Sequence, residues 1–129
     1  MKQRIHTSRA PRAIGPYSQA IRHDGLVWSA CQIALDPVTG ELVGATAAEQ
    51  TAQVLDNLAA VLEAAGSGFD RVLKATVLLV DLSEFGSVNE VYATRFTGAA
   101  PPARSAFQVT GLPRGALVGI ECVAACDPT

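Results

Sequence analysis

The chain has 129 residues, of which 49% are hydrophobic and 17% are charged, and its formal net charge is −2. This length fits a single domain, residues 1–129, whose core needs no disulfide or metal, and the small negative charge argues against binding to nucleic acid or to an anionic membrane. Because ordinary soluble domains are about 25% charged, the deficit predicts apolar surface that is covered in an oligomer. The alternative is that Ala, Val and Leu occupy exposed helix positions.

Cysteine usage and the N-terminus predict a cytoplasmic protein. Cys31, Cys122 and Cys126 form no C-x-x-C pair and have no histidine close by in the sequence, so we expect free, mostly buried thiols and no metal site. His6 and His23 are expected to be solvated. No apolar stretch reaches the length of a signal peptide or a membrane span, which predicts a soluble protein that is not exported.

The first elements are predicted to be strands. Residues 18–35 hold two apolar runs separated by Asp24-Gly25, a dipeptide that supplies the positive φ angles of a tight hairpin turn. DPVTGE, residues 36–41, is again typical of a turn, because Pro pre-sets φ and Gly accepts a left-handed backbone. We therefore expect a β-hairpin followed by a loop or a second short hairpin.

Residues 47–65 are predicted to form the first helix. Thr46 and Glu49 have the spacing of a capping box, and Gly66 follows as a left-handed C-terminal glycine. Apolar residues recur on one face at helical period; they are Val54, Leu55, Leu58, Val61, Leu62 and Ala65.

The second half of the chain predicts a strand, a helix and two further strands. Residues 71–82 are densely aliphatic and β-branched, which is typical of an interior strand covered on both faces. Residues 83–96 are predicted to be a helix capped by Ser83 or Asp81, with Phe85, Val88, Tyr92 and Phe96 on one stripe. The runs 104–111 and 116–126 predict another hairpin, connected by Leu-Pro-Arg-Gly.

This order of elements predicts an α+β fold, a six-stranded mixed sheet with two helices on one face. The opposite face of the sheet would then be left uncovered, and we expect neighbouring subunits to pack against it. The apolar strand residues expected to supply that face are Val27, Ile33, Val77 and Leu79.

Four stretches recur in one protein family in the order found here: AIGPYSQAI, FGSVNEVY, PARS and LPRGALVGIECVA. From about Ala10 to Ala125 the chain resembles the RidA/YjgF family of reactive-intermediate deaminases. The resemblance implies a chorismate-mutase-like fold and a homotrimer, with sheets that line a central barrel and clefts between subunits. It also implies hydrolysis of amino-acid-derived enamines or imines, such as 2-aminoacrylate and 2-iminobutanoate, to a 2-oxo acid and ammonia without a cofactor.

Arg104, in PARS, is the predicted substrate anchor. A 2-imino acid has a carboxylate next to its C=N carbon, and a guanidinium can hold that carboxylate with two parallel hydrogen bonds. The stiff Pro101-Pro102 lead and the start of a strand would limit the motion of the side chain. The alternative is an ion pair between Arg104 and a protein carboxylate, and the PARS match favours substrate binding.

Tyr17 and Asn89 match the family's site tyrosine and site-proximal asparagine. The Tyr17 hydroxyl would orient the attacking water while its ring walls the cleft; the alternative is a tyrosine packed at the sheet edge. Asn89 is explained equally well as a polar residue of an amphipathic helix.

Several positions depart from the deaminating members of that family. Those members usually carry Ser-Gly-Gln where this chain has Ala30-Cys31-Gln32, cysteine at Ala106, and Glu-Ile-Glu where this chain has Gly119-Ile120-Glu121. A site hydroxyl and the carboxylate thought to hold water near the imine are therefore missing. Glu121 points to the same strand face as Gly119, about 7 Å further along.

We expect Ala30, Ala106 and Gly119 to enlarge and depolarise the cleft, so that 2-iminobutanoate is turned over poorly and a bulkier acid is preferred. The predicted substrate-contacting set is Tyr17, Ala30, Cys31, Asn89, Arg104, Ala106, Gly119 and Glu121, with Arg104 and Tyr17 also taken as catalytic. No metal is expected.

Three functions compete at this stage. The favoured one is imine or enamine deamination, and the alternative is a non-catalytic module that binds a small carboxylate metabolite in the same intersubunit cleft. The third is the family's older label of endoribonuclease. It is disfavoured because the chain has no His pair and no Lys/Arg cluster with interleaved aromatics. The expected partners are a small 2-imino or 2-oxo acid and further copies of this chain, with neither nucleic acid nor membrane.

Overall fold

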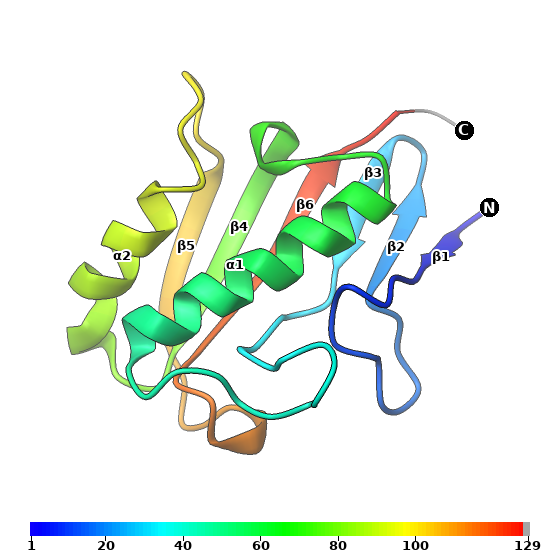
Figure 1. Ribbon diagram of the computed structural model, residues 1–129. Helices are drawn as coiled ribbons and strands as arrows, with labels where there is room; N and C mark the ends of the chain where they lie inside the picture. Colours follow the sequence, from blue (N-terminus) through cyan, green and yellow to red (C-terminus); the bar gives the residue numbers. More distant parts are fainter. Residues whose placement is uncertain (128–129) are drawn as a thin grey trace.

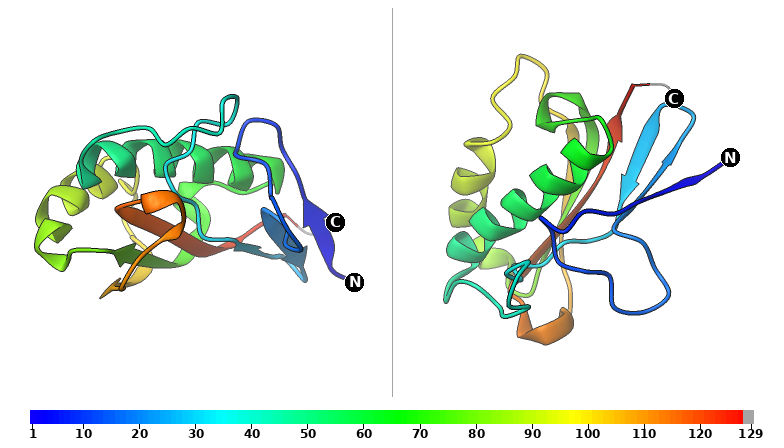
Figure 2. Two further views of the ribbon diagram at one scale, coloured as in Figure 1. Left: turned by 90° about the horizontal axis from the view of Figure 1, so that it is seen from below. Right: turned by 45° about the vertical axis from the view of Figure 1, so that its right-hand side comes forward.

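A computed structural model describes residues 1–127 and has two helices packed on one face of a six-stranded sheet (Figure 1). The view from below in Figure 2 shows both helices on the same side of the sheet. The predicted α+β architecture is confirmed. The strands are β1 (Gln3–Ile5), β2 (Ala20–His23), β3 (Leu26–Ser29), β4 (Val72–Leu79), β5 (Ala103–Gln108) and β6 (Val118–Ala125), and the helices are α1 (Ala47–Ala64) and α2 (Phe85–Ala93).

The hairpin predicted around Asp24-Gly25 is confirmed. Strands β2 and β3 pair antiparallel, and φ is 50° at Asp24 and 76° at Gly25. The DPVTGE segment is a loop organised by Asp36, whose Oδ1 accepts hydrogen bonds from the amides of Val38 (2.8 Å) and Thr39 (3.0 Å). These two amides hold the pKa of the Asp36 carboxyl below its usual value.

Helix α1 begins and ends where the sequence predicts. Thr46 Oγ1 accepts a hydrogen bond from the Glu49 amide at 3.1 Å, and Gly66 follows the helix with φ of 77°. All six residues of the predicted apolar stripe are buried. Because α1 contacts both α2 and β6, its apolar face forms the centre of the core.

Helix α2 is shorter than predicted. A 3₁₀ turn over Leu82–Glu84 precedes it, Asp81 caps that turn by accepting a hydrogen bond from the Ser83 amide at 3.0 Å, and the α-helix ends at Ala93. Val88 and Tyr92 are buried, as the stripe predicts.

The predicted hairpin between the last two strands is wrong. Strand β5 pairs parallel with β4, and β6 pairs antiparallel with β3 and β4, which gives the order β1-β2-β3-β6-β4-β5. Helix α2 is the crossover that brings β5 parallel to β4, and the 112–115 connection then carries the chain past β4 to its other side. A short polar connection between two strands therefore did not imply that they pair.

The predicted faces of the sheet are also corrected. Val27, Val77 and Leu79 lie beneath the helices, each at most 1% exposed, and Ile33 follows β3 in a loop. Side chains alternate between the two faces along a strand, so their neighbours supply the open face, on which Trp28 and Phe107 are 51% and 55% exposed. Strand β4, predicted to be covered on both faces, is covered on one face within the chain.

Candidate functional site

Arg104 lies on the edge strand β5, and its side chain is directed to the helix-covered side of the sheet. Its Nη1 donates a hydrogen bond to Asn89 Oδ1 of α2 at 2.6 Å. The guanidinium carbon lies 5.0 Å from the centre of the Phe85 ring and 4.8 Å from that of Tyr92. Both distances are in the range of cation–π attraction, so the exposed charge is held from three directions.

The geometry around Arg104 follows from two periodicities. Phe85, Asn89 and Tyr92 are four and three residues apart, which places them on one face of α2. On the sheet, Arg104 is opposite buried Ala75, whereas the next residue, Ser105, accepts a hydrogen bond from Lys74 Nζ at 3.0 Å. Alternation along β5 thus sends Arg104 toward α2 and Ser105 to the open face.

Arg104 pairs with no carboxylate of residues 1–127. None of the ion pairs formed within residues 1–127 involves it, and its partners are an amide oxygen and two aromatic faces. The sequence left open an ion pair between Arg104 and a protein carboxylate. Among residues 1–127 no such ion pair is formed.

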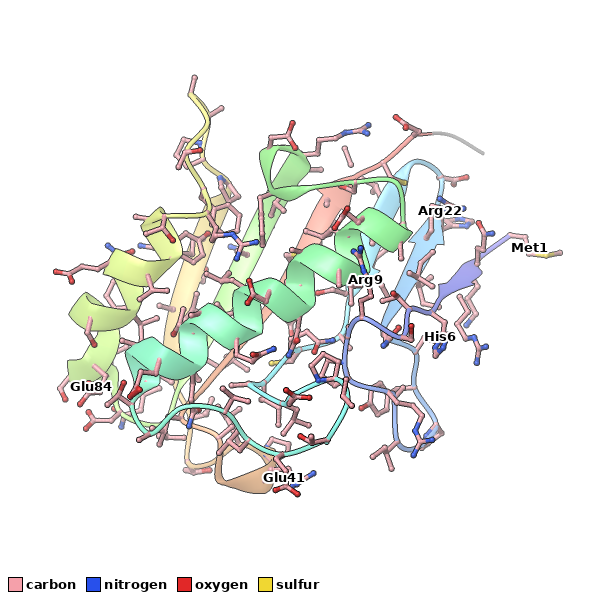
Figure 3. The ribbon with its side chains drawn as sticks, viewed as in Figure 1. Met1, His6, Arg9, Arg22, Glu41 and Glu84 are labelled. Carbon is pink, nitrogen blue, oxygen red and sulfur yellow. The ribbon has the colours of Figure 1, made fainter. Side chains whose placement is uncertain are left out.

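Tyr17 lies in the loop between β1 and β2, and the buried side chain of Gln19 organises that loop. Gln19 Nε2 donates to the carbonyls of Thr7 (3.0 Å) and Pro11 (2.8 Å), and Gln19 Oε1 accepts from the Thr7 amide at 2.7 Å. Arg9, which Figure 3 places over α1, pairs with Glu63 of that helix at 2.7 Å. The segment that leads to Tyr17 is thus fixed to the strands and to α1.

Tyr17 and Cys31 line one cavity of about 480 Å³. Tyr17 is 55% exposed, and its Oη is 3.4 Å from the Ile14 amide, which donates to it, so the phenolic proton remains available to a ligand. Most of the remaining wall is apolar, with Arg12 and Arg114 also contributing; its apolar residues are Pro11, Ile14, Ile33, Leu35, Leu78, Leu112 and Pro113.

Cys31 and Gly119 are in contact beside this cavity. A Cβ atom placed on Gly119 would lie 2.7 Å from Cys31 Sγ, closer than two such atoms approach. The predicted enlargement of the cleft at Gly119 is therefore wrong, because the Cys31 side chain takes up that space. Burial, and secondarily the negative charge of Glu121, raises the pKa of the Cys31 thiol to about 11.

The other predicted residues lie apart from this contact. Glu121 is exposed on the open sheet face opposite Thr76. Ala106 is half-buried and packs against the hydrophobic core, and Ala30 is half-buried, with its amide donating to the Gln19 carbonyl at 2.9 Å. Ala106 thus contributes to packing beneath α2 within the chain.

A single chain brings these residues together as two separate groups. Arg104 and Asn89 lie on β5 and α2 at one edge of the sheet, and Tyr17 lies in the loop before β2 near the opposite edge (Figure 1). Arg104 does not line the cavity that holds Tyr17 and Cys31. The candidate residues therefore lie in two separate groups, which we call half-sites.

Sequence reasoning missed the side chains that hold Arg104 and Tyr17 in place. The sequence predicts Phe85 and Tyr92 only as part of the apolar stripe of a helix. Their spacing from Asn89 was the one signal that both rings also flank the Arg104 guanidinium. Gln19 was overlooked. It directly precedes β2 and is buried, and a buried amide side chain needs hydrogen-bond partners.

Neither a cluster of metal ligands nor a membrane-spanning helix occurs in the described part of the chain. Within residues 1–127 no three His, Cys, Asp or Glu side chains gather as a metal site would need. No helix in that range combines the length and apolar character needed to cross a membrane. The three thiols are free, Cys31 half-buried and Cys122 and Cys126 buried.

Comparisons of sequence identify relatives along nearly the whole chain. A family model described as endoribonuclease L-PSP matches residues 7–126. A 2-iminobutanoate/2-iminopropanoate deaminase from Mus musculus is 49% identical over 124 residues, which cover 96% of this chain and 91% of that protein. A RutC family protein from Pyrococcus horikoshii is 48% identical over 124 residues, covering 96% and 98%.

Solved structures agree with this fold. A conserved Rid family protein of unknown function from Yersinia pestis superposes with a TM-score of 0.94 at 45% identity, covering 97% of this chain and 99% of that one. TdcF from E. coli, solved with bound serine, has a TM-score of 0.91 at 38% identity, covering 97% and 99%. The chain therefore belongs to the RidA/YjgF family, which the matching model describes as endoribonuclease L-PSP.

Proposed function

We propose that this chain hydrolyses a 2-imino or enamine acid to a 2-oxo acid and ammonia, in a homotrimer whose intersubunit clefts join the two half-sites. One subunit would supply Arg104 and Asn89, and its neighbour Tyr17, Cys31 and Gly119. Relatives at 48–49% identity are named as 2-imino acid deaminases, and TdcF holds serine, which has an α-carboxylate.

The observation that carries the proposal is the state of Arg104. Its guanidinium is exposed and held by Asn89 and two rings, with no ion-paired carboxylate among residues 1–127. Because a guanidinium has five N–H donors and Asn89 takes one of its bonds, an edge of the fork can receive a carboxylate. The substrate carboxylate would fix the position of the adjacent C=N carbon.

The proposed reaction needs only water as a second reactant. Water adds to the C=N carbon, forming a C–O bond, while the nitrogen takes up a proton. The resulting carbinolamine loses ammonia as its C–N bond breaks, which leaves the 2-oxo acid. In this scheme the Tyr17 hydroxyl orients the water, a kind of contribution worth about 10²- to 10⁴-fold when an acid or base is well positioned.

We further propose that the substrate is bulkier and more apolar than 2-iminobutanoate. The family's carboxylate is absent at Gly119, and the walls around Tyr17 and Cys31 are mainly apolar. The missing carboxylate also favours a second candidate function, in which the cleft binds a small carboxylate metabolite without turning it over.

The test generates imines from amino acids with an amino acid oxidase and traps them with semicarbazide. Wild-type protein should lower the trapped fraction, and Arg104→Ala should reduce this activity about 10²-fold, because a bidentate charged contact of roughly 3 kcal/mol is lost. Arg95→Ala is the matched control, since Arg95 also stacks on a ring, Phe69 at 4.9 Å, but pairs with Asp56 at 2.8 Å.

The outcomes separate the two functions. No acceleration by wild-type protein, together with binding of a 2-oxo acid that Arg104→Ala abolishes, supports the binding module. Full activity of Arg104→Ala would contradict the assignment of Arg104 as the carboxylate anchor and would rule out the non-catalytic module.

A further inference from the structure

Gly119 is a glycine for reasons of space. Six glycines of the chain have φ between 71° and 119°, where glycine is favoured, and Gly119 is not among them. It lies within β6 and is buried. A Cβ at this position would meet Cys31 Sγ at 2.7 Å, the Gln32 carbonyl oxygen at 3.5 Å and Ile33 Cγ2 at 3.5 Å. The thiol is thus the one neighbour that excludes a side chain here.

The backbone holds Cys31 against Gly119. The Gln32 amide donates to the Ile120 carbonyl at 2.9 Å, and the Ile120 amide donates back to the Gln32 carbonyl at 3.1 Å. This reciprocal pair joins the residues that directly follow Cys31 and Gly119. These hydrogen bonds hold the two backbones together, so a Cβ at position 119 requires Cys31 Sγ to leave its place.

The contact links positions 31 and 119, because a thiol at one occupies the place of a Cβ at the other. The resemblance noted from the sequence places glycine at position 31 and glutamate at position 119 in deaminating members, whereas this chain has the larger residue at 31 and glycine at 119. Where the resemblance implies a glutamate carboxylate at position 119, this chain has the Cys31 thiol in the same space. Burial raises the pKa of that thiol to about 11, so it carries no charge near neutral pH.

The adjoining cavity, as it stands open on one chain, exceeds the volume of a four-carbon acid. At roughly 30 Å³ per non-hydrogen atom, as in liquid water, 2-iminobutanoate would occupy on the order of 200 Å³, against a cavity of about 480 Å³. Ile33 both contacts the Gly119 position and lines this cavity. The size-matched pair therefore borders the space that a substrate side chain would enter.

We propose that Cys31, accommodated by Gly119, is a specificity-determining residue that selects 2-imino acids with branched or aromatic hydrophobic side chains over those of three or four carbons. This inference rests on the function proposed above. Cys31 contributes an uncharged thiol to a cavity wall that is mainly apolar and also includes Arg12 and Arg114. The apolar part of the substrate would pack against the apolar part of this wall, while Arg104 of the neighbouring subunit holds the carboxylate.

The test is a double-mutant cycle of Cys31→Gly and Gly119→Glu. Gly119→Glu alone should lower the Tm by about 5 °C or more, because the added side chain overlaps Sγ, and Cys31→Gly should restore the loss in the double variant. Gly111→Ala is the matched control, since a Cβ there has nothing within 4 Å, and it should leave the Tm unchanged.

The specificity readout is the ratio of kcat/KM for the imine of leucine to that for 2-iminobutanoate. Wild-type protein should favour the leucine imine, and the double variant should lower this ratio at least tenfold, the scale on which apolar pockets discriminate. A folded double variant with an unchanged ratio, or a Gly119→Glu protein as stable as the double variant, overturns the inference.

Binding of unreactive products separates this inference from the proposed function. Calorimetry with 4-methyl-2-oxopentanoate and 2-oxobutanoate measures the same preference without catalysis. If wild-type protein turns over neither imine but binds the larger oxo acid more tightly, and the double variant reverses that order, the deaminase function fails while the role of Cys31 stands. Turnover with no difference in binding or in rate ratio removes only the role of Cys31.

Discussion

At position 104, a permanent charge is held in place by groups that carry no net charge. Asn89 Oδ1 accepts one hydrogen bond at 2.6 Å, and the rings of Phe85 and Tyr92 flank the guanidinium. These contacts restrict the rotamers of Arg104 but leave its charge uncompensated by a carboxylate. The arginine is thus positioned before any substrate arrives, which lowers the entropic cost of binding.

Asn89→Asp tests whether the uncompensated charge of Arg104 binds an acid, because it places a carboxylate beside the guanidinium. A carboxylate at position 89 would pair with Arg104 and compete with the ligand, so we expect the Kd for a 2-oxo acid to rise at least tenfold. Asn89→Ala, which removes the acceptor without adding a charge, should have a smaller effect. Isothermal calorimetry measures both, and equal affinity of Asn89→Asp and wild-type protein would show that Arg104 does not bind the acid.

The buried thiols predict a dependence of stability on alkaline pH. Burial raises the pKa of Cys31 and of Cys122 from 9.0 to about 11. A group with a raised pKa in the folded state stabilises the protein below its unfolded pKa, and this contribution is lost as the pH rises from about 9 to about 11. In urea titrations with a reductant, the double variant Cys31→Ala, Cys122→Ala should lose less free energy of unfolding over this pH range than wild-type protein. Parallel curves would contradict these shifts.

At the scale of elements, the helices are set by local signals and the strands by their neighbours. Helix α1 has its own cap, its own C-terminal glycine and a stripe of apolar residues. Strand β5 has none of these: four of its six residues are exposed within one chain, and its position depends on parallel pairing with β4. The strand that carries Arg104 is thus an exposed edge of the sheet, which another chain could cover.

Thr46→Ala should weaken α1. The Thr46 hydroxyl accepts the Glu49 amide at 3.1 Å, and loss of an N-cap acceptor costs about 1 kcal/mol. The free energy of unfolding from urea titration should fall by about that amount, while Thr46→Ser, which keeps the acceptor, should remain near wild type. Both are compared at one protein concentration, because association contributes to stability. Equal losses in the two variants would indicate a packing role instead.

At the scale of the whole molecule, the separation of the half-sites is the main fact to explain. Arg104 and Tyr17 lie toward opposite edges of one sheet, and the face away from the helices exposes Trp28 and Phe107. Large apolar side chains on an uncovered sheet face are typical of a protein interface. A cyclic assembly would place the Arg104 side of one copy against the Tyr17 side of the next.

Mixing two inactive variants tests this arrangement. Arg104→Ala and Tyr17→Ala each remove one half-site, and both should be inactive alone. If the cleft is shared between subunits, co-expression should restore about a quarter of wild-type activity, because a random ring places an intact Arg104 beside an intact Tyr17 at that frequency. Absence of recovery in a mixed oligomer, verified by native mass spectrometry, would mean that the half-sites do not work together.

Much of the candidate site could be proposed from the sequence because motifs are local. PARS identified Arg104, GPYSQA identified Tyr17, and their places at the start of β5 and in the loop before β2 followed from neighbouring prolines, glycines and strands. The role of Asn89 stayed open, since a polar residue on an amphipathic helix needs no functional reason. The contact with Arg104 was visible only after α2 packed beside β5.

What the sequence by itself determined was the local structure: the capped helix α1, the Asp24-Gly25 hairpin and the alternation of side chains along each strand, all of which depend on residues a few positions apart. Tertiary structure alone decided that β6 lies between β3 and β4, which side chains face the helices, and that Cys31 fills the space at Gly119. These outcomes depend on pairing between strands whose partner residues are up to 99 positions apart, because Leu26 of β3 lies opposite Ala125 of β6. Local propensity carries no information about such pairing, whereas close packing of the core permits only one arrangement.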